Sequence, residues 1–174
     1  MRKLVLLVCA VTALAAATVG WAVQPTPGTL SVERGRGVVM IDLKGSVVGR
    51  LTTGSLRVTD HTPFDRYTAV VYGRKLTQER VGPRTIVYKG IGLRFRMLGG
   101  GYRMVARGAG ITVSAVGRGN VMLDGEPRFE ADDLGVYSLD GTDCSVEPLT
   151  CTPLPLEPER FVLEPLEPQP KAAQ

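Results

Sequence analysis

The 174-residue sequence contains one histidine, His61, and only 6% of its residues are aromatic. A single histidine excludes any site that needs two, and no cofactor is expected. Periodic apolar patterns long enough for a useful helix are also missing. What the chain has instead is 21 glycines and 12 prolines, a composition that favours many tight turns over long helices.

The N-terminal segment has the pattern of an export signal. Arg2 and Lys3 precede an uncharged run from Leu4 to Val23, and a basic start followed by an apolar stretch is typical of a secretory signal peptide. We predict that residues 1–22 are this signal, although a run of this length can also be a membrane anchor. Under either interpretation the remaining chain is extracytoplasmic (secreted, periplasmic or cell-surface), and it meets a membrane only through this segment.

Two cysteines, Cys144 and Cys151, follow that segment. An oxidising compartment favours a disulfide between them. The bridge would close a small ring in a proline-rich stretch, so we expect it to stiffen a loop rather than hold a core together. Two cysteines and one distant histidine are too few for a tetrahedral metal site, so no metal is expected.

Positive and negative charge are separated along the chain. Between Arg34 and Arg118, 13 arginines and 3 lysines stand against 4 acidic residues, whereas between Asp124 and Glu167, 12 acidic residues stand against 2 arginines. This asymmetry predicts that the acidic segment docks on the basic one, or that the two meet different partners. Nucleic acid is not an expected partner, because the protein is predicted to be exported and carries no recognition motif.

Glycine pairs recur with a period of nine residues. They begin at Gly90, Gly99, Gly108 and Gly117, and weaker copies begin near residues 35, 44 and 53. Turn signals at this interval are typical of all-β domains. We therefore predict an all-β domain over residues 29–140, formed by an antiparallel meander of short strands with glycine turns and folded as a sandwich or small barrel.

Strand alternation assigns the apolar residues between these glycines to one buried face. They are Leu93, Phe95, Met97, Tyr102, Met104 and Ala106. A hairpin with Gly99 and Gly100 in its turn would pair Met97 with Tyr102 and keep all six on that face, and a second hairpin would turn at Gly108. A β-solenoid of nine-residue repeats is the alternative, without the calcium-binding aspartates of one such class.

From residue 141 onward the composition changes. Seven of the 12 prolines lie between Pro148 and Pro170, and proline at this density disfavours helix and inner strand. We predict a disordered, acidic, proline-rich tail over residues 141–174.

Four arginines share the outer face of the predicted sheet. They are Arg94, Arg96, Arg103 and Arg107. The predicted register sets Arg96 directly opposite Arg103, and like charges in that position are destabilising. An anionic component of the cell envelope, or the protein's own acidic tail, would compensate them, so the four are candidate anion-binding residues. The competing interpretation is that the four arginines form a solvated face: their aliphatic stems cover the sheet and their guanidinium groups point to water.

The nine-residue pattern is least regular around Asp60, His61, Asp65 and Tyr67. Carboxylates, an imidazole and a phenol so close in sequence could form a catalytic or binding loop. A surface turn built by Thr-Pro and aspartate caps explains the same residues. No nucleophile elbow accompanies them, and no catalytic residue is assigned.

These features together predict an exported, non-enzymatic binding or structural module of the cell envelope. One alternative is an exported enzyme that uses the loop of Asp60, His61 and Asp65. The other is a small-molecule carrier that holds its ligand in the apolar interior of a barrel.

Overall fold

The computed structural model describes residues 28–66 and 68–164, and within them seven strands form one antiparallel sheet. The strands are β1 (Thr29–Asp60), β2 (Val70–Gly82), β3 (Thr85–Met97), β4 (Gly101–Gly125), β5 (Val136–Ser138), β6 (Thr152–Pro153) and β7 (Glu159–Leu163). Two short 3-10 turns, η1 (Ala131–Asp133) and η2 (Pro148–Thr150), complete the described elements. The predicted all-β, antiparallel fold is confirmed. In the described part of the chain, no helix has the length and apolar character needed to cross a membrane.

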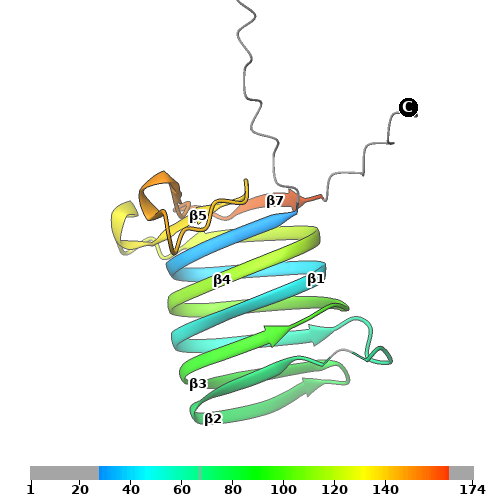
Figure 1. Cartoon of the computed structure of the whole chain (residues 1–174). Coiled ribbons are helices and arrows are strands. Elements are labelled where there is room, and N and C mark those ends of the chain that lie inside the picture. The colour runs from blue at the N-terminus through cyan, green and yellow to red at the C-terminus, as the bar shows by residue number, and fades with distance from the viewer. Residues whose placement is uncertain (1–27, 67, 165–174) are drawn as a thin grey trace, which may run out of the picture.

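The two longest strands, β1 and β4, wind round each other as successive turns of a coil (Figure 1). A residue in the middle of β1 pairs with two residues of β4, one on either side. Ile41, for example, lies between Met104 and Val121, which are seventeen positions apart. A full turn therefore takes about seventeen residues of either strand. Half a turn is close to the nine-residue glycine period.

The coil is flattened into two faces that enclose one hydrophobic core (Figure 1). We call them the Ile41 face and the Val113 face. On the Ile41 face the stacked residues are Phe161, Val121, Ile41, Met104, Val58, Ile86 and Arg80. On the Val113 face they are Tyr137, Val32, Val113, Gly49, Phe95 and Val71. The packing is that of a sandwich whose strands continue from one layer into the other.

Glycines stack where the strands pass between the two faces. One corner is a column of five glycines: Gly125, Gly37, Gly108, Gly54 and Gly90. Gly54 and Gly108 have φ angles of +135° and +145°. A Cβ on either one would overlap a carbonyl oxygen of the partner strand, so only glycine lets both backbones bend together here. The nine-residue period therefore marks the spacing of corners within continuous strands.

The predicted buried face is confirmed, but the predicted hairpins are wrong. All six apolar residues assigned to that face are buried, from Leu93 through Ala106. Met97, however, pairs with Val47, and Tyr102 pairs with Leu43 and Asp60. The strands β3 and β4 lie on opposite sides of β1. Alternation is a local property of a strand, whereas its partner depends on whether a glycine bends the chain or reverses it.

The C-terminal segment caps one end of the coil. β7 pairs with β4, β5 pairs with β1, and β6 pairs with β5. Leu134, Leu154 and Leu163 are buried and belong to the core. The prediction of disorder is therefore wrong for residues 141–164, because apolar residues between the prolines bury against the coil. Residues 165–174 and the predicted signal at 1–22 lie outside the described residues.

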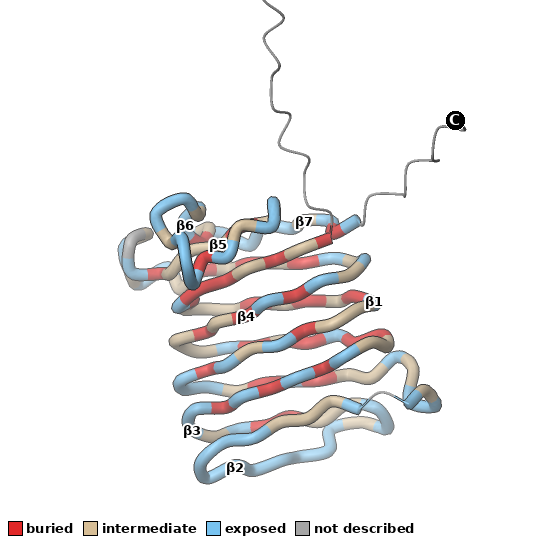
Figure 2. Tube along the Cα trace, in the orientation of Figure 1, coloured by how far each residue is buried: buried red, intermediate tan, exposed pale blue. Residues whose placement is uncertain are grey.

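The opposite end of the coil finishes at the edge strand β2, whose residues are nearly all exposed (Figure 2). Its pairing with β3 is irregular around Lys75, which has a φ angle of +50°. Charged residues and bulges on an edge strand hinder pairing with other chains. The two ends of the coil thus differ: the C-terminal segment covers one end, and the other ends in an exposed, irregularly paired edge strand.

Candidate functional site

The four candidate arginines are divided between the two faces of the coil. Arg94 and Arg96 lie on the Val113 face, whereas Arg103 and Arg107 lie on the Ile41 face. Arg96 is opposite Val48 of β1, so its predicted opposition to Arg103 is wrong. The error follows from the hairpin register, because the chain turns a corner between β3 and β4 instead of folding back on itself.

Arg103 is balanced within the protein. It lies directly opposite Asp42 of β1, and its Nε and Nη2 donate hydrogen bonds to Oδ2 of Asp42 at 2.8 and 2.5 Å. Charge-assisted bonds to a carboxylate are among the stronger hydrogen bonds in proteins. Neither a ligand nor the acidic segment is needed to compensate this arginine.

The structure instead places like charges directly opposite each other at Arg50 and Arg94, and also at Lys44 and Arg118. Of these two pairs, Arg50 and Arg94 line the grooves described below. These residues are directly opposite each other on β1 and β3, and both are exposed. Glu33 lies beside Arg50, with its Oε1 3.4 Å from the arginine Nη2. Among the described residues, no ion pair joins a carboxylate to Arg94. One carboxylate against two guanidinium groups leaves a local positive charge on this face.

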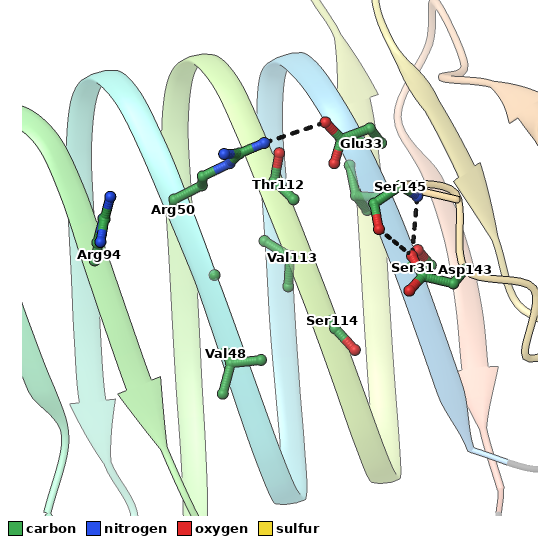
Figure 3. Close-up of a pocket in the computed structure, with 12 residues that line it drawn as sticks. Ser31, Glu33, Val48, Arg50, Arg94, Thr112, Val113, Ser114, Asp143 and Ser145 are labelled. Carbon is green, nitrogen blue, oxygen red and sulfur yellow. Dashed lines mark hydrogen bonds and ion pairs between the residues drawn. The ribbon is translucent and has the colours of Figure 1, made fainter. Parts of the chain in front are cut away.

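A groove of about 330 Å³ opens on the Val113 face beside the two arginines (Figure 3). Short outward side chains line its middle, because small residues stand where long ones would fill the space. They are Ser31, Val48, Thr112 and Ser114. A second groove of about 480 Å³ is lined by Arg50 and Arg94 again, together with Tyr72 and Arg74. The arginine pair therefore lies where the two grooves meet.

Glu33 has an unusual environment for a groove residue. The residue is 8% exposed, and its Oε2 is buried without a hydrogen-bond partner. A buried carboxylate oxygen without a donor is destabilising, because its lost hydration is not replaced. A donor supplied by a ligand would relieve that cost. Neither Glu33 nor Arg50 was a candidate from sequence, because only the pairing of distant strands brings them beside Arg94.

The disulfide between Cys144 and Cys151 is present, as predicted. It does more than stiffen a loop, since Cys144 is fully buried and its backbone N–H donates to Oγ of Ser31 at 3.0 Å. This contact holds the Asp143–Ser145 turn at the rim of the first groove (Figure 3). Hydrogen bonds from the Ser145 side chain and backbone lower the pKa of Asp143. The disulfide is compatible with an oxidising compartment.

The predicted loop site is organised around a threonine. Asp60 accepts a hydrogen bond from the backbone N–H of Thr62 at 2.8 Å, and Asp65 accepts one from its hydroxyl at 2.6 Å. The same hydroxyl accepts a bond from the backbone N–H of Gly101 at 3.0 Å. These are the contacts of a turn that docks on the start of β4. Tyr67 lies outside the described residues.

His61 contacts a carboxylate that sequence reasoning did not associate with it. Its Nε2 lies 3.3 Å from Oδ1 of Asp42, the residue that also binds Arg103 through its other oxygen. The structure therefore places the imidazole of His61 beside Asp42, on the Ile41 face.

Tyr102 is a buried polar group that the sequence assigned only to the core. It is 1% exposed, and its hydroxyl has no hydrogen-bond partner. Burial, followed by the negative charges of Asp60 and Asp65, raises its pKa to about 12. The two loop carboxylates thus act electrostatically on the first turn of β4, where the phenol of Tyr102 is buried away from solvent.

Within the described residues, no three histidine, cysteine, aspartate or glutamate side chains gather closely enough to hold a metal ion. No protein-family model, curated protein or solved structure matches this chain. The groove beside Arg50 and Arg94 is therefore the feature from which a function is best inferred.

Proposed function

We propose that the protein is an exported, non-enzymatic binding module of the cell envelope, in which Arg50 and Arg94 receive the anionic group of a ligand. The observation that carries this proposal is their direct opposition across β1 and β3, at the junction of two grooves. Export is supported by the signal-like N-terminal segment and is compatible with the disulfide.

The electrostatics of the pair favour an anion between them. Like charges directly opposite on an antiparallel pair destabilise the sheet, and an anion that contacts both removes that repulsion. Guanidinium groups also bind carboxylates, sulfates and phosphates through paired, planar hydrogen bonds. Arg50 keeps one contact with Glu33, so Arg94 is the less compensated of the two.

The packed interior favours this module over the carrier. Phe95 fills the core beside Gly49 so closely that a Cβ there would lie 2.6 Å from its ring. Leu51, Leu93 and Met97, also directed inward on this face, are fully buried. The two grooves beside Arg50 and Arg94 open instead at the surface.

The contacts of the loop give the enzyme alternative less support. Asp60 and Asp65 both accept hydrogen bonds from Thr62, an arrangement that builds a turn. His61 is turned toward Asp42.

The proposal is tested by titrating the folded protein with sulfate at low ionic strength, followed by NMR. We expect chemical-shift changes at Arg50 and Arg94, and at least fivefold weaker binding in Arg94→Gln. Arg107→Gln removes an exposed arginine from the Ile41 face and should leave this binding unchanged. Salt at ~0.5 M should weaken it, because exposed charges are then screened within a few ångströms. Absence of sulfate binding, or equal loss in the two variants, would overturn the proposal.

A further inference from the structure

We infer that the anionic ligand of this site is an acidic saccharide, an inference that rests on the proposed function. The groove makes two opposite chemical demands within a few side chains. Arg50 and Arg94 require hydrogen-bond acceptors with negative charge, whereas the buried Oε2 of Glu33 requires a donor. A ligand that satisfies both must carry an anionic group together with a hydrogen-bond donor, and the hydroxyl groups of a sugar are such donors.

Simple anions meet only the first demand. Sulfate and acetate are acceptors without a donor, so either one could bind the arginines but would leave the Glu33 oxygen without a partner. A saccharide that carries a carboxylate can place that group on the arginines. One of its neighbouring hydroxyls can then donate to Glu33.

The remaining surface of the first groove is suited to hydroxyl groups. Thr112 and Ser114 of β4 line it between the arginines and the disulfide turn (Figure 3). A side-chain hydroxyl can donate and accept, so it can pair with a sugar hydroxyl in either orientation. Asp143, the other acid here, accepts hydrogen bonds from Ser145 at 2.7 and 2.9 Å, so its carboxylate is engaged within its own turn.

The second groove extends the site by one more strand. Tyr72 of β2 lies opposite Arg94 and is 63% exposed, so its ring offers a flat surface on which the apolar side of a sugar can stack. Arg74 lies in the same groove. Neighbouring strands are about 4.8 Å apart, so the row from Glu33 through Thr112, Arg50 and Arg94 to Tyr72 spans roughly 19 Å. That length accommodates several linked sugar units, not one.

Calorimetry with the full chain tests the inference, using sulfate, monomeric galacturonate and short oligomers of galacturonate and hyaluronan as probes. We expect at least one oligomer to bind tenfold or more tightly than the monomer and sulfate. Glu33→Ala should lower the ratio of oligomer affinity to sulfate affinity about tenfold. Sulfate uses only the arginines, and its binding should be unchanged or stronger once the neighbouring carboxylate is gone.

Two further variants separate a ligand contact from a general loss of structure. Thr112→Val keeps the shape of the side chain and removes its hydroxyl, so it should weaken oligomer binding several-fold and leave sulfate binding unchanged. Tyr72→Ala should weaken the oligomer more than the monomer. Thermal unfolding of each variant should remain close to that of the wild type. Tyr72 is exposed, and Thr112→Val keeps the side-chain shape and removes one long, exposed hydrogen bond from the backbone N–H of Arg34, at 3.5 Å.

The possible results distinguish this inference from the proposed function. Sulfate binding with no tighter binding of any acidic oligomer would overturn the saccharide and retain the anion site. Absence of binding to all probes would overturn both. Preferential binding to vesicles that contain anionic phospholipid would assign the arginines to a lipid headgroup and overturn the saccharide.

Discussion

Gly54 of β1 and Gly108 of β4 lie directly opposite each other at one corner of the coil. Each occupies the space that a side chain on the other strand would need, since a Cβ on Gly54 would overlap the carbonyl of Arg107 and one on Gly108 would overlap that of Thr53. The two strands can therefore turn the corner together without separating. This contact lets long strands form two packed faces.

Substitution at this corner should be severely destabilising. Gly108→Ala combines a φ of +145° with a backbone overlap, and we expect a loss of about 3 kcal/mol in the free energy of unfolding. Gly82→Ala is the matched control, because its Cβ would lie 3.7 Å from Thr85, an ordinary contact. Urea denaturation should show less than about 0.5 kcal/mol for that control. Similar losses in both variants would contradict a tightly packed corner.

Removing the unpartnered hydroxyl of Tyr102 should stabilise the protein. Tyr102→Phe keeps the ring in the core and eliminates a buried donor, with an expected gain of about 1 kcal/mol in the free energy of unfolding. Thermal or urea denaturation at neutral pH measures it. A loss of more than 1 kcal/mol would mean that the hydroxyl is hydrogen-bonded in solution.

The same residue should make stability fall at high pH. The pKa of Tyr102 is raised from 10.0 to about 12 in the folded protein, so between these values the folded state holds a proton that the unfolded state has released. The raised pKa of Tyr102 therefore contributes to the free energy of unfolding. This contribution is complete below pH 10 and is lost as pH rises through about 12. Tyr102→Phe should reduce the slope of unfolding free energy against pH in that window. An unchanged slope would assign the effect to other groups, such as Tyr88 and Tyr137, whose pKa values burial also raises.

Breaking the disulfide should lower the free energy of unfolding by more than it would if the bridge lay in a tail that does not pack against the fold. The bridge joins residues seven apart, a ring whose closure is worth about 2 kcal/mol, and Cys144 is also buried against β1. The double variant Cys144→Ala with Cys151→Ala should therefore lose about 2 kcal/mol or more in urea denaturation. It should also weaken oligosaccharide binding, because the turn at the groove rim is released. Unchanged stability would contradict the role of this segment as a cap.

Asp140 should titrate well below an ordinary aspartate. A hydrogen bond from the Ser138 hydroxyl, helped by bonds from Thr142, lowers the pKa of Asp140 from 3.8 to about 2. Its stabilising effect is present above pH 3.8 and is lost as pH falls through about 2. Ser138→Ala should raise this pKa toward 3.8, as measured by NMR titration of the carboxyl carbon. An unchanged pKa would mean that Thr142 alone supplies the effect.

Alternation along the chain was sufficient to identify the core residues of β3 and of the first part of β4. The inward direction of Leu93, Phe95 and Met97 follows from the two-residue period of an extended backbone, and all three are buried. The disulfide between Cys144 and Cys151 could also be predicted, because the two residues are close in sequence. Glycine spacing located the corners but not their geometry.

Strand partners could not be derived in the same way. Gly99 and Gly100 are compatible with a hairpin turn and with a corner, and the choice between them decides whether Arg96 faces Arg103 or Val48. The site depends on that choice, since Arg50, Arg94 and Glu33 meet only when β1 runs between β3 and β4. The sequence by itself determined which side chains point inward, because that direction is set by adjacent peptide units. Only the tertiary structure decided which charges face each other, because the packing of both strands around the shared core selects the bend over the reversal.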